Sequence, residues 1–255
     1  MSAVADARAA QVAVFRDYFG LQLAFAETLA ARSGLPLSEA VRGFTNLHRR
    51  LSLGEVSEAP PGAEWRRYAE GLDRAPDAPS RLDWTMEVMA AAPDEPPQPN
   101  KVRFGCFSYD PPDAGVVRIH FNNHDSRDGA GPLARSKVGA RRSELARMFA
   151  HLRRTAPEAE TVAGASWLYH VEAYRRLFPP AYTASATLAG KVGLTGVSSW
   201  GQFLTHQGAV KGDLSQTFLE GLGGLDPDAP WLAFPLRPLR VSAPIACLED
   251  HFGLG

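Results

Sequence analysis

A cluster of polar side chains at the end of a short apolar run is the first candidate for chemistry in this chain. The cluster contains His120, Asn122, His124 and Asp125, within and just after the run VVRIHF. Residues two apart in an extended strand share a face, so His120, Asn122 and His124 are expected to project together. Such a face suits substrate hydrogen bonding or a general base. A metal pair completed by Asp125 or His170 is an alternative without a firm third ligand, and a structural polar edge is another.

Aromatic and polar residues at the end of a second apolar segment form another candidate. The segment TVAGASWLYH ends in residues that include Trp167, Tyr169 and His170. Open α/β sheets build their clefts at the carboxyl ends of strands, so Tyr169 is expected to act as a general acid and His170 as a base. Trp167, together with Trp200 and Gln202 from a later segment, is expected to line the same cleft and contact the substrate. A Trp/Tyr core layer is the alternative, with packing as the role of Trp200.

A glycine-bearing turn between these two candidates precedes a basic amphipathic helix. Gly129 and Gly131 lack a Cβ, which lets the backbone approach a ligand closely, and Ser136 can cap the helix. The cations around the turn and the helix start are Arg127, Arg135, Lys137, Arg141 and Arg142. Cations at this end oppose the helix dipole, at a cost of roughly 0.3–1 kcal/mol each at an exposed site. A bound anion would explain that cost, and a polar loop with a solvated helix face is the alternative.

The balance of charge narrows the classes of partner. The chain of 255 residues has a formal net charge of −1 at pH 7, which argues against general binding to nucleic acid or to a membrane surface. Residues 127–154 contain eight Lys or Arg and two Asp or Glu, a local charge of +6, so the rest of the chain carries −7. Most of these cations are expected to be solvated, and some to contact phosphate or carboxylate. A small-molecule substrate is the expected partner, and a homodimer is possible.

The two cysteines, Cys106 and Cys247, lie far apart without a CxxC spacing, which is typical of a reducing compartment. The N-terminus lacks the apolar segment of a secretory signal, and no run of about 18 apolar residues occurs, so a cytoplasmic protein is expected. Cys106 is flanked by aromatic residues, as in a core position, and a Cys–His nucleophile with His120 is the alternative. The G-x-S-x-G, Walker A and H-E-x-x-H motifs are absent, which removes the commonest hydrolase, nucleotide-triphosphatase and metalloprotease interpretations.

The N-terminal third of the chain has a helical pattern. Apolar residues recur at spacings of three and four over 8–32, which predicts a mostly buried helix that ends at Gly34. Pro36 is expected to begin a second helix that continues to about Leu51. Shorter helices are predicted at 64–72 and 82–91.

A proline-rich segment then separates this pattern from a different one. Residues Pro93–Pro99 contain four prolines, which can neither continue a helix nor pair in a central strand. We therefore predict a helical part over 1–92, a linker over 93–99 and an α/β domain over 100–255. The fold class is α/β (α+β), with the helical part packed on a mixed, mainly antiparallel C-terminal sheet of about five to six strands flanked by helices.

Periodicity and turn residues place the elements of the α/β domain. The runs KVRFGCFSY and GVVRIHFNN are expected to form a hairpin. The later elements are predicted as a helix at 138–154, a buried strand at 161–169, a short helix at 172–178, a strand at 182–188, a helix at 213–222, a strand in LRVSAPI and a helical turn at 248–252.

The order of strand, glycine-bearing turn, basic helix, strand and short helix over about 116–187 resembles the second half of the GCN5-related N-acetyltransferase (acyl-CoA acyltransferase) fold. In that family the turn and the helix N-terminus hold the pyrophosphate of acetyl-CoA, and the short helix after the next strand lines the pantetheine end. The corresponding residues here are Arg127-Asp128-Gly129-Ala130-Gly131 and Glu172-Ala173-Tyr174-Arg175-Arg176-Leu177-Phe178. The family's turn is Gln or Arg, two residues, Gly, one residue, then Gly or Ala. The present turn is one residue shorter and is followed by Pro132.

Three functions follow from these candidates. The first is a small-molecule enzyme, an acyl-CoA-dependent acyltransferase, in which the anion-binding turn at 127–142 holds the cofactor. His120, His124 or His170 would then act as the base and Tyr169 as the acid. The second is a non-catalytic ligand- or partner-binding protein, with the apolar first helices as its contact surface. The third is a metal- or Cys-dependent hydrolase, although no metal is favoured.

Overall fold

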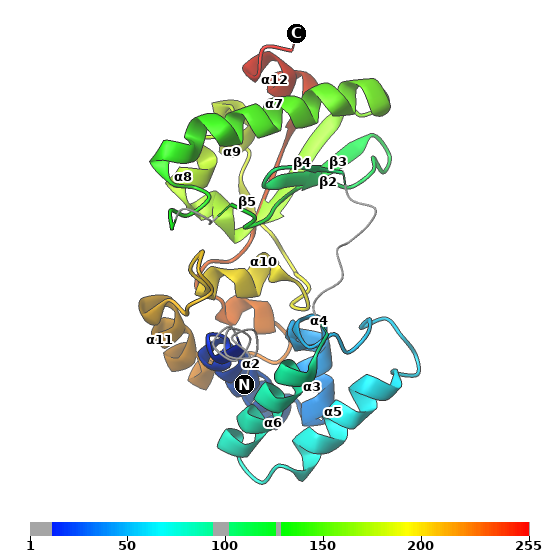
Figure 1. The fold of residues 1–255 in the computed structure, drawn as a ribbon, viewed down its shortest axis with the longest axis vertical. Helices are drawn as coiled ribbons and strands as arrows, with labels where there is room; N and C mark the ends of the chain where they lie inside the picture. Colours follow the sequence, from blue (N-terminus) through cyan, green and yellow to red (C-terminus); the bar gives the residue numbers. More distant parts are fainter. Residues whose placement is uncertain (1–11, 94–101, 126–128, 255) are drawn as a thin grey trace, which may run out of the picture. The chain divides into compact units, whose positions relative to one another are not determined.

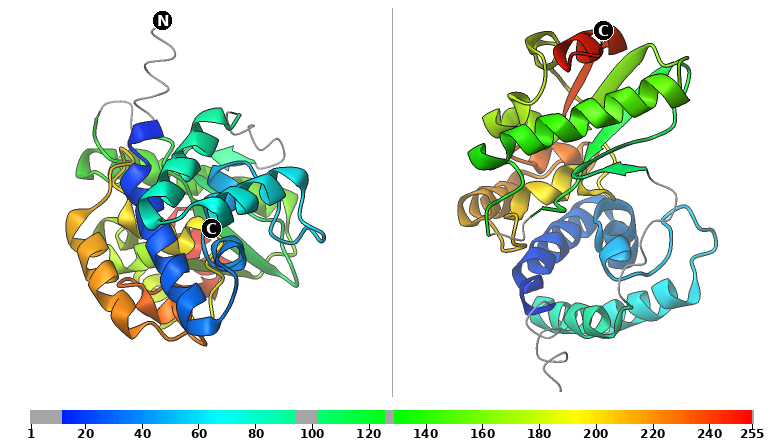
Figure 2. Two further views of the ribbon diagram at one scale, coloured as in Figure 1. Left: turned by 90° about the horizontal axis from the view of Figure 1, so that it is seen from below. Right: turned by 45° about the horizontal axis from the view of Figure 1, so that its top comes forward.

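The structure is a computed structural model that describes residues 12–93, 102–125 and 129–254. Contacts divide the chain into two compact units (Figures 1 and 2). The first, which we call the helical unit, comprises Met1–Pro96 and Lys191–Pro235; the second, the sheet unit, comprises Pro97–Gly190 and Leu236–Gly255. Within the described ranges, no helix is both long enough and apolar enough to cross a membrane.

The helices of the helical unit come from two stretches of sequence, one before and one after Pro97–Gly190 of the sheet unit. Those before it are α2 (Arg16–Ser33), α3 (Leu37–Phe44), α4 (Leu47–Arg50), α5 (Ala63–Arg74) and α6 (Ala78–Ala91). Those after it are α10 (Val197–Trp200), η3 (Gly201–Phe203), α11 (Gly212–Gly221), η4 (Leu222–Gly224) and η5 (Pro230–Ala233).

Local sequence signals account for several of these helix ends. Gly34 adopts a left-handed conformation, with φ of 75°, and its N–H donates to the carbonyl of Ala30, which ends α2 as predicted. Asp77 caps α6 by accepting a hydrogen bond from the backbone N–H of Ser80 at 2.8 Å.

The helix predicted from Pro36 to Leu51 is instead two helices, and a tertiary contact explains the break. The N–H of Asn46 donates to Oε1 of the buried Gln22 at 2.9 Å, and Thr45 Oγ1 donates back to the carbonyl of Val41. Polar side chains that bond to the backbone in this way compete with helix continuation.

Residues 191–235 pack with the N-terminal helices, whereas the sequence pattern assigned them to the C-terminal domain. The reason is an aromatic core centred on Trp200. Its ring lies 5.4 Å from that of Phe25 in α2 and 4.9 Å from that of Phe234, edge-on in both cases. Its Nε1 donates to the carbonyl of Leu194 at 2.8 Å, so the polar edge of the indole is satisfied in the core.

The sheet unit contains one six-stranded sheet with strand order β1-β2-β3-β4-β6-β5. The strands are β1 (Arg103–Phe104), β2 (Phe107–Tyr109), β3 (Val116–Phe121), β4 (Thr161–Ser166), β5 (Thr187–Leu188) and β6 (Leu239–Pro244). β3 and β4 pair in parallel, and the other neighbours pair antiparallel. The mixed, mainly antiparallel sheet that the sequence predicted is therefore present.

Helices cover one face of this sheet, and Figure 1 shows α7 lying across the strands. The helical elements are η1 (Arg135–Lys137), α7 (Val138–Thr155), η2 (Trp167–His170), α8 (Glu172–Arg175), α9 (Pro180–Ala184) and α12 (Ile245–His251). In α7 the predicted apolar residues Leu145, Met148, Phe149 and Leu152 are fully buried. They pack with Val117, Val162, Val241 and Ala243 of the sheet, which alternate with exposed residues along their strands.

Two predicted strands are shorter than expected. The strand predicted over 161–169 ends at Ser166, because its hydroxyl accepts the N–H of Leu168 at 3.1 Å and begins the helical turn η2. Much of the strand predicted over 182–188 is α9, which begins at Pro180, a residue favoured in the first turn of a helix. The alternation of apolar residues did not distinguish these short segments.

Candidate functional site

The parallel strands β3 and β4 separate at their carboxyl ends. Their pairing runs from Val116 opposite Thr161 to Arg118 opposite Ala163. Beyond that row β3 continues for three residues and β4 continues to Ser166, each paired only with its other neighbour. We call the unpaired halves, 119–121 and 164–166, the strand opening. These two segments do not pair with each other, and they lie at the end of the sheet where α/β folds place their ligand sites.

Tyrosine side chains fill the covered side of the strand opening. A Cβ placed on Gly164 would lie 2.0 Å from Oη of Tyr169 and 2.8 Å from Oη of Tyr182, so only glycine leaves room for these hydroxyls. The two hydroxyls are 3.0 Å apart, and the ring of Tyr174 packs edge-on against Tyr169 at 5.2 Å. Burial raises the pKa of all three phenols. They therefore stay protonated at neutral pH and are weaker acids than an exposed tyrosine, so the acid role of Tyr169 stays a prediction.

The predicted anion turn leads from β3 into α7. Gly129 has φ of 75°, which favours glycine, and among the described residues nothing lies within 4 Å of where its Cβ would be. Ser136 does not cap the helix as predicted, because η1 precedes α7 and neither has a side-chain cap. Gly131 is half-buried and Arg135 is exposed. Arg127 lies outside the described residues.

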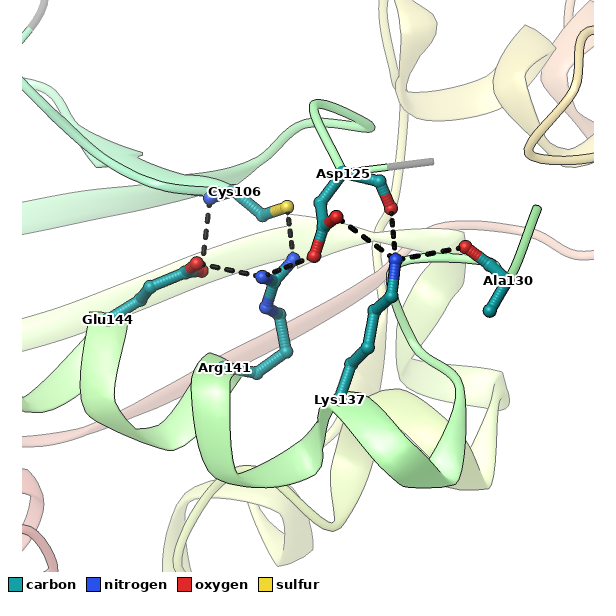
Figure 3. Close-up of polar contacts among 6 residues, drawn as sticks. All are labelled: Cys106, Asp125, Ala130, Lys137, Arg141 and Glu144. Atoms are coloured by element: carbon teal, nitrogen blue, oxygen red, sulfur yellow. Dashed lines mark hydrogen bonds and ion pairs between the residues drawn. The ribbon is translucent and has the colours of Figure 1, made fainter. Parts of the chain in front are cut away.

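The carboxylate of Asp125 holds two of the predicted anion-binding cations. Lys137 Nζ lies 3.0 Å from Asp125 Oδ1 and also donates to the backbone carbonyls of Asp125 and Ala130 (Figure 3). Arg141 Nη2 lies 2.8 Å from Asp125 Oδ2. The hydrogen bond from Lys137 lowers the pKa of Asp125, and the charges of both cations add to this effect. An internal anion therefore occupies the position predicted for a ligand's phosphate.

A second carboxylate, that of Glu144, completes this charge cluster. Its Oε1 lies 2.8 Å from Arg141 Nη2, and its Oε2 accepts the backbone N–H of Cys106 at 3.0 Å (Figure 3). Arg141 Nη1 also donates to the Cys106 Sγ. We call Cys106, Asp125, Lys137, Arg141 and Glu144 the α7 cluster.

The α7 cluster requires glycine at position 105. A Cβ on Gly105 would lie 2.0 Å from the Glu144 carboxylate, and the residue has φ of 63°, which also favours glycine. Cys106 is 1% exposed, and burial raises the pKa of its thiol. A buried, protonated thiol is a poor nucleophile, so this environment does not favour the predicted Cys–His pair.

The histidines predicted as bases lie apart from one another. His120 is in β3 and its Nε2 lies 2.7 Å from Asp110 Oδ2. His124 follows the strand and its Nε2 lies 3.2 Å from Arg103 Nη1. Burial, and then the charge of Arg103, lowers the pKa of His124, so its ring is neutral at pH 7.

His170 lies in η2, where its Nε2 contacts the carbonyl of Arg237 at 2.8 Å. Among the described residues, no three His, Cys, Asp or Glu side chains come close enough to hold a metal ion. Arg142, predicted to contact the cofactor, instead has its Nη2 3.2 Å from Nε2 of His251.

The residues predicted to contact substrate are distributed over both units. Asn122 continues the hairpin, with its N–H donating to the Cys106 carbonyl at 2.8 Å, and Trp167 begins η2 at the end of β4. Trp200 and Gln202 are fully buried in the helical unit, where Trp200 packs in the aromatic core. Because both side chains are fully buried, neither lines an open cleft as predicted.

Sequence reasoning missed several residues that take part in these contacts. They are Arg103, Gly105, Asp110, Glu144, Gly164 and Tyr182. The i,i+3 spacing of Arg141 and Glu144 on a predicted helix was a usable signal for one of them. The others depend on strand register and helix packing. Comparisons with protein-family models, curated proteins and solved structures found no match for this chain.

Proposed function

We propose that this protein is an acyl-CoA-dependent acyltransferase. The observation that carries the proposal is the strand opening: two parallel strands separate at their carboxyl ends, and the helix that follows the first of them, α7, begins at the same end of the sheet. The chain also has the order of strand, turn, helix, strand and short helix on which the resemblance to the acyltransferase fold rests.

Some residues of the sheet unit suit parts of acyl-CoA, and others do not. Pantetheine is an extended chain with two amides, and the unpaired edges at 119–121 and 164–166 can donate and accept hydrogen bonds along such a chain. The exposed Arg135 suits the pyrophosphate. Lys137 and Arg141 do not fit that role while Asp125 and Glu144 neutralise them.

Bound acyl-CoA would supply a thioester whose acyl carbon is open to attack by a nucleophile. Side chains of the protein would then donate and remove the protons of the reaction. The acid that we propose for the leaving thiolate is the phenol of Tyr169, whose hydroxyl lies 3.0 Å from that of Tyr182. His120, held by Asp110, is the base that we propose for the acceptor. Tyr169 lies in η2, the turn that follows β4, and His120 lies in the neighbouring strand β3.

A direct test is the binding of CoA and acetyl-CoA, measured by calorimetry and by thermal stabilisation. The native protein should bind, and Arg135→Glu should weaken binding about tenfold by removing one charge-assisted contact. Arg147→Glu is the matched control, because Arg147 is an exposed arginine farther along α7 and should leave affinity unchanged. Absence of binding by any CoA species would remove the proposal.

Turnover separates binding from chemistry. Tyr169→Phe keeps the ring packing and removes only the hydroxyl, so CoA affinity should hold while kcat falls by about 100-fold or more. Release of free CoA thiol from acetyl-CoA in the presence of amine mixtures is the measurement. If kcat for Tyr169→Phe matches the native value, the phenol is not the acid.

A non-catalytic ligand-binding protein is the second candidate, favoured by the neutralisation of Lys137 and Arg141 within the fold. It predicts CoA binding without turnover, or binding of another ligand. The apolar residues of α2 are not its contact surface, because Tyr18, Phe19, Phe25 and Leu29 are fully buried in the core of the helical unit.

A further inference from the structure

One face of the six-stranded sheet is not covered by the helices of its own unit. Strand register puts Arg118, Ala163 and Ser242 in one row, and Arg118 and Ser242 are exposed. The same alternation exposes Arg240, two residues from Ser242. Arg118, Arg240 and Ser242 therefore reach solvent on this face, in contrast to the residues of the opposite face under α7.

Register also brings three further residues to this face. Arg103 pairs with Ser108, and Ser108 pairs with His120, so their side chains share the face of Arg118. We call Arg103, Ser108, Arg118, His120, Arg240 and Ser242 the open face. Of its residues, His120 lies in the unpaired half of β3, so the open face borders the strand opening on the side away from the tyrosines.

The cations of the open face are weakly neutralised. Arg118 has a 3.9 Å ion pair with Asp113, and these side chains are 58% and 79% exposed. Arg240 is exposed and makes no ion pair with any described residue. Asp110 is already paired with His120. Arg118 and Arg240 lie two strand spacings apart, about 9.6 Å across the sheet, and Arg240 is also two residues, about 7 Å, farther along the strands. Two long side chains can reach one small anion on the diagonal between them.

Ser108 provides an independent observation. It is 1% exposed, and its Oγ has no hydrogen-bond partner in the described part of the chain. A buried hydroxyl without a partner is uncommon in folded proteins, because its desolvation is then uncompensated. The open face therefore carries an unsatisfied hydroxyl at its buried edge, beside His120.

We propose that the open face binds a small molecule bearing an oxyanion, a carboxylate or a phosphate, through Arg118 and Arg240. The identification of this molecule as the acyl acceptor rests on the proposed function. His120 then removes a proton from the acceptor's nucleophile, which faces the acyl group through the strand opening. Anion binding itself does not depend on CoA.

The test is a titration of the full-length protein without CoA, followed by NMR of backbone amides and histidine ring protons. Succinate and inorganic phosphate are the two anionic probes, and neutral succinamide is the control for shape. Saturable shifts at Ser108, His120 and Arg240 with either anion, and not with succinamide, are the expected result. The two anions distinguish a carboxylate from a phosphate ligand.

Variants assign the binding to the open face. Arg118→Gln with Arg240→Gln should weaken anion binding at least about tenfold. Arg67→Gln is the matched control: Arg67 is also 58% exposed and has a 3.9 Å ion pair, with Glu64, but lies in the helical unit. Ser108→Ala should weaken binding less than the double variant.

Three results would overturn the inference: no saturable shift with either anion, equal shifts with succinamide, or unchanged affinity in the double arginine variant. If the protein binds an anion but not CoA, the proposal for the open face is supported and the proposed acyltransferase function is overturned. CoA binding without anion binding would do the reverse.

Discussion

The α7 cluster and the open face put arginines of the same unit in opposite environments. In the α7 cluster the Arg141 side chain is 4% exposed and contacts two carboxylates. On the open face the Arg118 side chain is 58% exposed, and its one carboxylate lies 3.9 Å away. Burial of a cation costs free energy unless the cation is paired, and Asp125 and Glu144 pair with Arg141. An exposed cation carries no such cost and stays available to a ligand.

This difference indicates which arginines organise the fold and which are free for function. Arg141 joins the β1–β2 turn to the first part of α7 through Cys106 and Glu144. Its charge is used inside the protein. The arginines of the open face contribute little to packing, and their charge is directed to solvent.

Removal of one arginine from each group gives the largest expected contrast. Arg141→Ala leaves Asp125 and the buried Glu144 without their shared partner, and should lower the free energy of unfolding by about 3–5 kcal/mol. Arg240→Ala should change it by less than about 0.5 kcal/mol. Urea unfolding followed by circular dichroism measures both. Similar values for the two variants would contradict the distinction between the clusters.

Two glycines with the same backbone conformation test whether the α7 cluster is closely packed. Gly105→Ala introduces both a strained φ and a contact with the Glu144 carboxylate, and should destabilise by about 3 kcal/mol. Gly129→Ala introduces the strain alone, since nothing lies within 4 Å, and should cost about 1 kcal/mol. Thermal unfolding compares the two. An equal cost would show that Glu144 moves away easily.

The smallest expected effect is on the acid stability of the protein. Lys137 and Arg141 lower the pKa of Asp125 in the folded state, so its contribution to stability is present above the ordinary carboxyl pKa of about 4 and is lost as pH falls through the lowered value. Asp125→Asn should flatten the loss of stability below about pH 4. Asp113→Asn, which removes the long, exposed pair with Arg118, is the control. Unfolding free energies measured from pH 6 to pH 3 decide between these outcomes.

Long periodic segments were predictable from sequence because their apolar faces are continuous. The helix at 138–154 was predicted almost to its ends, and the strand in LRVSAPI was found as β6. The assignment of 191–235 failed for the opposite reason. Its contacts with α2, such as that of Trp200 with Phe25, join residues far apart in the sequence, and no local pattern records them.

The candidate site shows the same limit. Tyr169 could be proposed from its position at the end of an apolar segment, and it is at the carboxyl end of β4, just after the strand. Gly164, whose missing side chain makes room for the hydroxyl, could not be found without coordinates. Nor could Ser108 or Arg240, because a one-residue change in strand register would move each to the other face of the sheet.

The sequence by itself determined the fold class, the glycine turn before a basic helix, and the number of cations near that helix. These depend on residue type and on spacing along the chain. Only the tertiary structure decided which cations are available, because neutralisation depends on carboxylates brought in from other segments. Asp125 reaches Arg141 across 16 positions of sequence, and burial in a medium of low polarity then makes that pairing obligatory.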